Sequence, residues 1–463
     1  MAKKKEAATS EQRLQEALVP CAEWPYKVPE NWCWVKLKVL SSIISKGTTP
    51  KGGKSAYLSE GINFLRVENI QDDGFISHSG IMHISEDMHE GFLKRSILED
   101  GDILVSIAGT LGKTGIVRDI DLPLNTNQAI AFVRLLSDLL NRNYIKQSID
   151  NPIIQDYLLK QTKVTSIPNL TLEIIGNCPI ALPPLSEQQR IVNRIESLFA
   201  QLDEAKEKAQ VALDSFEPRK AAILHKAFTG ELTGKWREET QVDSDSWKIK
   251  TASQLFQYVT SGSRGWAQYY SDNGDIFVRM GNLDHGTIEL DLADIQYVQL
   301  PTKAEGQRSR LKKDDILISI TADIGMIGLV REIPGDAYIN QHIALARPAG
   351  EDSAEFIAWY LVSDVGLNQM RKKQRGATKI GLGLDDIRTL ELPMPSLDEQ
   401  LEIVRILNSL LTKEQQAKEA AESVLEQIEL TKKAILARAF RGELGTNDPT
   451  EESSVELLKS ILQ

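Results

Sequence analysis

The sequence predicts an α+β chain: two tandem mixed α/β domains separated by two long antiparallel helices, which form a coiled coil with pseudo-two-fold symmetry. Three observations lead to this prediction. The chain of 463 residues contains one unit twice, each copy holds several short β-rich runs, and each copy ends in an apolar heptad pattern. At about 100–200 residues per domain, the length has room for such a duplication.

The duplication is clearest in three pairs of segments. "GDILVSIAGTLGKTGIV" (101–117) recurs as "DDILISITADIGMIGLV" (314–330), "FLRVENI" (64–70) as "FVRMGNL" (277–283), and "NQAIAFVR" (127–134) as "NQHIALAR" (340–347). Each pair is 213 residues apart, and the same offset pairs Trp34 with Trp247. Because these β-rich runs are bounded by Gly, Asp and Asn, they predict strands.

The repeat also argues against a nucleotide-binding loop at Gly112-Lys113-Thr114. A P-loop needs its first glycine five residues before the second, and Ile107 stands at that position. The second copy has Gly325-Met326-Ile327 there, so a phosphate-binding lysine would be missing from it.

Each copy ends in a predicted long helix. "LSEQQRIVNRIESL" (185–198) matches "LDEQLEIVRILNSL" (397–410) at an offset of 212. Apolar residues in both follow the alternating four–three spacing of a heptad seam. Two such helices could pack on unrelated surfaces, but matched seams of equal length favour mutual antiparallel pairing. The predicted seam residues are Ile191, Ile195, Leu198 and Leu202 in the first helix, and Ile403, Leu407, Leu410, Val424 and Ile428 in the second.

The ends of these helices are also predicted. Ser186 follows two prolines and has the side chain of an N-cap. Pro218 should kink or break the first helix, whereas its counterpart Leu430 should not. Gly230 and Gly442 should end the two helices. Forty-odd residues at ~1.5 Å each make a rod of about 60–65 Å, long enough to act as a ruler between the domains.

The predicted order of segments follows from the repeat. It is an N-terminal arm (1–30), a first globular domain (31–185), a central spacer helix (186–230), a second globular domain (231–396), a C-terminal spacer helix (397–442) and a tail (443–463).

Composition excludes several classes of protein. Three widely spread cysteines and six histidines have no metal-ligand spacing, so we expect no metal site and a reducing, cytoplasmic location. No apolar run approaches the ~20 residues that span a membrane, and the charged N-terminus lacks the apolar core of a secretory signal. The sole Pro-Pro pair, Pro183-Pro184, lies between leucines and does not form an adenine-methyltransferase loop. We therefore predict no catalytic residues.

Taken together and in order, the motifs resemble the specificity subunits of type I restriction–modification systems. The relevant segments are the repeated "NQ-I" turn, "RGATKIGLGLDDI" (375–387) before "LPMPSLDEQLEIV" (392–404), and the helix ending "AFTGEL" (227–232). The resemblance implies two target-recognition domains that each read half of a split double-stranded DNA target in the major groove. It also implies helices that dock two methyltransferase subunits, with restriction–translocase subunits joining them. S-adenosylmethionine would then belong to the methyltransferase subunit, ATP and Mg²⁺ to the restriction subunit, and no cofactor to this chain.

The readout segments should be those in which the two copies differ most, because the half-sites should differ. These are "SKGTTPKGGKSAY" (45–57) and "TSGSRGWAQYYSDNG" (260–274), whose Lys, Arg, Ser and Tyr donors can reach base edges and phosphates. Basic residues at 94–95, 307–313 and 370–379 could add phosphate contacts; alternatively, all of these are polar surface. The candidates are Lys46, Thr48, Lys51, Lys54, Tyr57, Lys94, Arg95 and Lys113 in the first copy, and Ser263, Arg264, Trp266, Tyr269, Arg308, Arg310, Arg371, Lys372, Lys373, Arg375 and Lys379 in the second.

Residues that recur unchanged should not read sequence. Arg66 and Asn69 recur as Arg279 and Asn282, and the "NQ" pair recurs as well, so we expect structural hydrogen bonds from them rather than base contacts. The net charge of −11 leaves a second interpretation open, a protein-binding scaffold with duplicated domains on a coiled coil.

Overall fold

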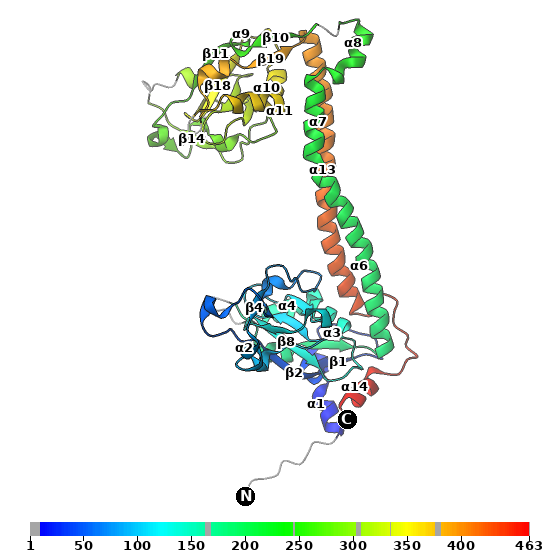
Figure 1. Ribbon diagram of the computed structural model, residues 1–463. Helices are drawn as coiled ribbons and strands as arrows, with labels where there is room; N and C mark the ends of the chain where they lie inside the picture. Colours follow the sequence, from blue (N-terminus) through cyan, green and yellow to red (C-terminus); the bar gives the residue numbers. More distant parts are fainter. Residues whose placement is uncertain are drawn as a thin grey trace. The chain divides into compact units, whose positions relative to one another are not determined.

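The computed structural model describes residues 10–162, 168–243, 246–301, 307–333, 335–375 and 381–462 (Figure 1). Packing divides the chain into two compact units. Unit 1 comprises Met1–Lys208 and Val424–Gln463, and unit 2 comprises Ala209–Ser423. Each unit therefore contains one globular copy of the repeat and parts of both long helices.

Unit 1 contains a four-stranded antiparallel sheet, β2-β8-β5-β6, and a three-stranded sheet, β4-β3-β7, in which β3 and β7 are parallel. A separate antiparallel pair, β1–β9, leads into the first long helix. The strands are β1 Cys33–Lys36, β2 Ser41–Lys46, β3 Ile62–Leu65, β4 Met82–Ile84, β5 Ile103–Ser106, β6 Thr114–Ile116, β7 Leu124–Thr126, β8 Ile130–Leu135 and β9 Pro179–Leu182. The short helices are α1 Ser10–Ala17, α2 Glu86–Glu90, α3 Arg142–Asp150, α4 Pro152–Lys160, α5 Leu172–Gly176 and α14 Ser454–Leu462.

Unit 2 repeats this topology and adds one edge strand, β12, to the second sheet. Its sheets are β11-β18-β15-β16 and β12-β14-β13-β17, with β13 and β17 parallel, and its antiparallel pair is β10–β19. The strands are β10 Lys248–Thr251, β11 Phe256–Ser261, β12 Tyr270–Ser271, β13 Asp275–Val278, β14 Gln296–Val298, β15 Ile316–Ser319, β16 Ile327–Leu329, β17 Ala337–Ile339, β18 Ile343–Pro348 and β19 Glu391–Met394. The short helices are α8 Gly234–Thr240, α9 Ala252–Leu255, α10 Ala354–Val362, α11 Asp364–Lys372 and α12 Leu384–Arg388. The predicted α+β fold and its duplication are confirmed.

Strand β5 of unit 1 and its counterpart β15 of unit 2 are inner strands of their sheets and are buried on both faces. In β5, Ile103 and Val105 join the core beneath the helices, while Leu104 joins the core between the two sheets. In β15, Ile316 and Leu317 divide in the same way. Because side chains alternate along a strand, a strand buried on both faces reads as a continuous apolar run, as these two do.

The structure corrects one pair in the sequence alignment. The indole of Trp32 donates to Glu187 at 2.7 Å, and that of Trp247 donates to Glu399 at 3.1 Å. Glu187 and Glu399 are counterparts, so the counterpart of Trp247 is Trp32 and the predicted pairing with Trp34 is wrong. The loop after β2 is two residues longer than the loop after β11, so the offset is 215 before these loops and 213 after them.

The long helices are α6 Leu185–Asp214, α7 Phe216–Phe228 and α13 Leu397–Ala439. In unit 1, Lys206 pairs with Glu429 and Lys432 pairs with Asp203, an order that requires antiparallel helices. Glu414 is a polar residue that interrupts the apolar seam of α13. In unit 2 it pairs with Arg219, which accounts for its presence there.

The predicted break is confirmed. The first helix is interrupted at Ser215, three residues before Pro218, where a continuous helix would place the proline ring against the carbonyl of Asp214. Helix α13 continues through Leu430. Both helices end before glycines with positive φ, Gly230 at 80° and Gly442 at 75°, as predicted.

The seam prediction is confirmed except at Val424. Ile191, Ile195, Ile403, Leu407 and Ile428 are buried, and Leu198, Leu202 and Leu410 are half-buried. Val424 is 45% exposed, and the neighbouring Leu425 is half-buried in its place. The register shifts by one residue at Leu410–Leu411, and from there the less exposed residues are Leu411, Glu414, Lys418, Ala421, Leu425 and Ile428.

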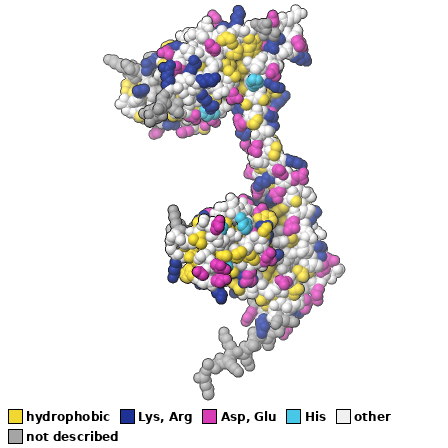
Figure 2. Space-filling view, viewed as in Figure 1, with side chains coloured by type: hydrophobic (Ala, Val, Ile, Leu, Met, Phe, Trp, Pro, Cys, Tyr) yellow, Lys and Arg dark blue, Asp and Glu magenta, His cyan; other side chains and the backbone are white. Residues whose placement is uncertain are grey.

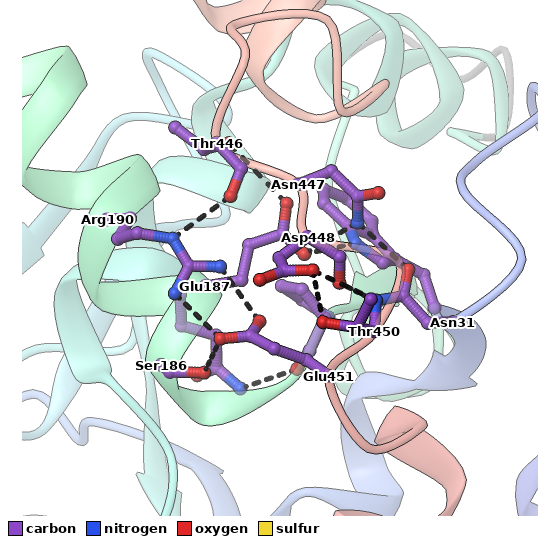
Figure 3. A network of polar contacts seen from close by, with 12 residues as sticks. Asn31, Ser186, Glu187, Arg190, Thr446, Asn447, Asp448, Thr450 and Glu451 are labelled. Carbon is purple, nitrogen blue, oxygen red and sulfur yellow. Dashed lines mark hydrogen bonds and ion pairs between the residues drawn. The ribbon is translucent and has the colours of Figure 1, made fainter.

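The start of α6 is held by residues that follow α13 (Figure 3). Arg190 donates to both carboxylate oxygens of Glu451 at 2.8 Å, and the Ser186 hydroxyl donates to Glu451 at 2.7 Å. Glu187 is fully buried and accepts from Asn447 as well as Trp32. Burial raises the pKa of Glu187 in spite of these bonds. Ser186 lies inside the helix rather than at its N-cap, so that prediction is wrong: the first helical bond goes to the carbonyl of Pro184.

None of the helices in the described part of the chain combines the length and apolar character needed to span a membrane. The longest, α13, is strongly charged along its length.

Candidate nucleic-acid interface

The loop after β2 leaves the sheet at a glycine that no other residue can replace. A Cβ on Gly47 would lie 2.1 Å from the carbonyl oxygen of Asn127, and one on Gly262 would lie 2.1 Å from that of Ile339. The repeated "NQ" turn is shaped locally, because Asn127 accepts from the backbone N–H of Ala129 and Asn340 from that of His342. The expected structural role of these asparagines is confirmed, and both copies launch their variable loops from the same kind of junction.

Asn69 and Asn282 are structural in the same sense. Each accepts the backbone N–H of the arginine three residues earlier, at 3.0 Å for Arg66 and 2.8 Å for Arg279. Both asparagines are buried, so they shape a turn and have no access to a nucleic acid.

In unit 1 the variable loop and the basic turn at 94–95 come together. The 3₁₀ turn η5 (Lys94–Ser96) carries Arg95, whose Nη2 donates to the hydroxyl of Thr48 at 3.0 Å. The ammonium of Lys51 lies 4.9 Å from the centre of the Phe92 ring. We call Lys46, Thr48, Lys51, Lys94 and Arg95 the first basic surface; the cations of this group are exposed. Phe92, which is 49% exposed, was missed from the sequence because nothing marks a lone aromatic residue in a turn.

Three other candidates in unit 1 are placed differently. Tyr57 packs on Phe64, with ring centres 5.6 Å apart, and belongs partly to the core. Lys113 forms an ion pair with Asp72 at 2.9 Å, so its charge is partly satisfied within the protein. The side chain of Lys54 lies outside the described part of the structure.

In unit 2 the corresponding loop exposes Arg264, which precedes Gly265 with its φ of 78°. The prediction that Trp266 contacts DNA is wrong, because this side chain is 5% exposed and stacks on Phe277 with ring centres 5.4 Å apart. Tyr269 packs against the same cluster, and Ser263 is buried beside Asn340. Of the residues predicted in this loop, Arg264 is thus the one whose side chain is exposed.

The remaining basic residues of unit 2 fall into two groups. Arg310 pairs with Asp336 and Arg375 with Asp386, so their charges are partly satisfied within the protein. Arg308, on the 3₁₀ turn η11 (Gln307–Ser309), and Arg371 and Lys372, at the end of α11, are exposed. Lys373 is half-buried, and Lys379 lies outside the described residues. Figure 2 shows Lys and Arg interspersed with carboxylates on the visible face of the protein.

Buried ion pairs support both basic turns. Arg134 donates to Asp102 through Nε at 2.9 Å and Nη2 at 2.8 Å, and Arg347 donates to Asp315 at 2.6 and 2.7 Å. The two arginines also donate to backbone carbonyls beside η5 and η11. Burial raises the pKa of Asp102 even with these bonds in place. The signal was present in the sequence, since both arginines close the repeated octapeptide at 127–134 and 340–347.

A duplicated scaffold that keeps its buried polar contacts and varies its exposed basic loops defines a recognition protein with two different reading surfaces. The chain belongs to the family described as "Type I restriction modification DNA specificity domain", whose model matches residues 29–213 and 245–427. The two matched ranges correspond to the two copies of the repeat.

Individual relatives agree over most of the chain. The EcoBI specificity subunit of Escherichia coli is 23% identical over 432 residues, covering 90% of this chain and 87% of that protein. The MjaVIII specificity subunit of Methanocaldococcus jannaschii is 23% identical, covering 90% and 94%. Among solved structures, the HsdS subunit from Thermoanaerobacter tengcongensis has a TM-score of 0.60 at 19% identity, covering 91% of this chain and all of that one. A chain from a study of complex assembly in the type I R-M system reaches 0.71 at 20% identity, with the same coverage.

Proposed function

We propose that this chain is the DNA-reading subunit of a type I restriction–modification complex and that each unit reads one half of a split, asymmetric target. The observation that carries the proposal is the contrast between the copies. Matched scaffold residues of the two copies make the same kinds of contact, whereas the loops after β2 and β11 differ in length, sequence and exposed cations. Two different surfaces should select two different half-sites, so the target is not a palindrome.

Within each unit, phosphate contacts and base contacts have different carriers. The cations of the first basic surface and Arg308, Arg371 and Lys372 supply sequence-independent contacts to phosphates. Arg264 is the base-reading candidate, because an arginine can donate two hydrogen bonds to guanine in the major groove.

The chain supplies recognition and leaves chemistry to its partners. No cofactor loop is in register in the sequence, and the conspicuous polar clusters at the starts of α6 and α13 are structural contacts between buried carboxylates and indoles. In this proposal two methyltransferase subunits dock on the long helices and use S-adenosylmethionine, while restriction subunits use ATP and Mg²⁺. The purified chain alone should neither methylate DNA nor hydrolyse ATP.

The test is to co-express the chain with its methyltransferase subunit and to map methylated adenines by single-molecule sequencing. One bipartite motif with two different halves is the expected result. A gel-shift titration tests the competing scaffold interpretation, which the family match does not favour: a DNA reader loses affinity steeply as salt rises. Absence of any methylated motif, together with no salt-dependent binding to duplex, would contradict the proposal.

A further inference from the structure

Unit 2 has a groove beside its four-stranded sheet that no reading loop occupies. Its volume is about 830 Å³, and it is lined by Arg308 of η11, by residues 312–314, by the end of β18 and by the start of α10. Unit 1 has the same groove, of about 690 Å³, lined by residues 99–101, the end of β8 and the start of α3. The repeat therefore forms the same groove twice, with an offset of 213 residues along the sheet wall and 212 along the helix wall.

The charges of the two grooves are opposite. Lys312 and Lys313 in unit 2 take the places of Glu99 and Asp100 in unit 1. The residues lining the unit 2 groove include five cations and three carboxylates, whereas those lining the unit 1 groove include two cations and three carboxylates. A shared hollow whose charge is reversed at matched positions suggests that only one of the two meets an anion.

The cations of the unit 2 groove are also available. Lys312, Lys313 and Arg308 are exposed and form no ion pair with any residue that the structure describes. Two of the three carboxylates are engaged, Glu355 with Arg331 at 2.8 Å and Asp352 with Lys250 at 3.0 Å. Only the exposed Asp314 is left to oppose the free cations.

In unit 1 the corresponding charges are already neutralised. Glu99 pairs with Arg134 at 2.5 Å and Asp100 with Arg142 at 2.7 Å. Asn141 and Ser353 are the matching N-caps of α3 and α10, so the counterpart of Glu355 is the uncharged Asn143, and the reversal of charge is confined to the wall that carries Glu99 and Asp100. The unit 1 groove thus has no free cation with which to hold a phosphate.

We infer that the unit 2 groove, through Arg308, Lys312 and Lys313, binds the phosphodiester backbone of duplex DNA flanking the second half-site, and that unit 1 makes no equivalent contact. The inference rests on the proposed function. Continuity favours DNA over an acidic protein segment: Arg308 is the counterpart of Arg95, which bonds to the variable loop in unit 1, and the Tyr258 hydroxyl fixes the carbonyl of Arg308 at 3.2 Å. Lysines suit binding to the DNA backbone, because the flexible side chain carries a point charge that binds phosphate without distinguishing between bases.

The test measures binding of the full chain to a duplex carrying its methylation motif, across a salt titration. The variant is Lys312→Gln with Lys313→Gln. The matched control is Lys413→Gln with Lys433→Gln, which removes the same charge from exposed positions of α13. Each lost phosphate contact should reduce the magnitude of the slope of log K against log salt by about 0.9. The slope of the groove variant should therefore be shallower than that of the wild type by about 1.8. Between 50 and 200 mM salt both proteins should lose affinity, and the fold loss of the variant should be about twelve times smaller than that of the wild type.

A second arm shortens the duplex beside the second half-site until the groove has no DNA to contact. The wild type should then acquire the shallow slope of the variant, while shortening beside the first half-site should change nothing. Discrimination between the cognate and a scrambled duplex should survive in the variant.

The outcomes separate the inference from the function beneath it. A wild type that cannot distinguish cognate from scrambled duplex would overturn the proposed function. A groove variant that discriminates and keeps the wild-type slope would overturn the groove assignment alone. So would a variant that binds DNA normally but no longer co-purifies with the methyltransferase subunit, since the groove would then hold an acidic segment of that protein.

Discussion

The substitution Arg134→Ala should expose how strongly the first reading surface depends on a buried charge. Asp102 is 0% exposed and accepts two bonds from Arg134, at 2.9 and 2.8 Å, and one from the backbone N–H of Glu99 at 2.8 Å. Removing the guanidinium leaves a buried carboxylate with a single donor. Breaking a buried pair in this way costs about 3–5 kcal/mol, a large part of the ~5–15 kcal/mol that stabilises a domain.

The loss should depend on pH in a defined direction. Burial already raises the pKa of Asp102, and the variant loses the bonds that lower it. In the unfolded chain this carboxyl ionises at its ordinary pKa, so at intermediate pH the folded state binds more protons and its stability falls as pH rises. The destabilisation should therefore be small near about pH 4–5 and full at about pH 8, measured by urea denaturation.

The effect on DNA should be confined to one half-site. Arg134 also donates to the carbonyl of Ile97, directly after the turn that carries Arg95. We expect weakened methylation that depends on the first half-site, with the second unchanged. Arg347→Ala is the matched control, because it frees Asp315 in unit 2 and should give the reverse pattern.

The double variant Asp102→Ala/Arg134→Ala decides whether the orphaned charge is the cause. With both partners gone no ion is left buried, so the double variant should be more stable than Arg134→Ala alone. A loss of less than about 1 kcal/mol in the single variant, or a double variant that shows the sum of two independent losses, would refute the reasoning.

Three further predictions concern separate parts of the chain. Arg264→Ala should relax the second half-site by about 1–3 kcal/mol while the first stays intact; a methylation motif unchanged on both sides would show that the loop is only surface. Maleimide should label Cys21 alone in the native chain, because Cys21 is exposed whereas burial raises the pKa of Cys33 to about 11 and of Cys178 to about 12; mass spectrometry showing early labelling of either buried thiol would contradict this. Inserting four residues near Ala205 adds about 6 Å of helix, so the methylated motif should keep its half-sites with a spacer one or two base pairs longer; an active protein with the old spacer would show that the helix does not measure distance.

Much of the scaffold could be predicted because repetition acts as an internal control. Residues such as Asn69 and Asn282 recur while their neighbours diverge, and each proves to shape the same turn. The break before Pro218 follows from local sterics alone. Features of this kind depend on a few neighbouring residues, which is why the sequence suffices for them.

The misjudged residues depend on distant contacts instead. Trp266 stands in a polar, variable loop, but Phe277 and Tyr338 from other strands enclose it. Val424 follows the heptad count, but the register shifts by one residue at Leu410–Leu411, so Leu425 is half-buried in its place. The sequence pairs Trp34 with Trp247 only if the two copies are 213 residues apart throughout. The two-residue difference between the loops after β2 and β11 makes this assumption fail before those loops.

The starts of the two long helices show how one scaffold serves two non-identical units. Glu187 and Glu399 are both fully buried, and each accepts from an indole and from the segment that follows the other long helix. In unit 1 that segment contributes Asn447, and in unit 2 it contributes Thr233 and Arg237. The buried part of the contact is therefore common to both units.

The charge beside this common core is reversed at one position of the helix. Arg190 on α6 pairs with Glu451 of the tail, whereas the matching position on α13 is Glu402, and in unit 2 the cation comes from the segment as Arg237. Placed at the start of α13, the tail would bring Glu451 to the position of Glu402. Like charges in contact repel, by about 1 kcal/mol even in bulk water and more where they are partly buried. The shared glutamate thus preserves the fold of each unit, while the exchange of Arg190 for Glu402 fits the tail to the start of α6 and not to the start of α13.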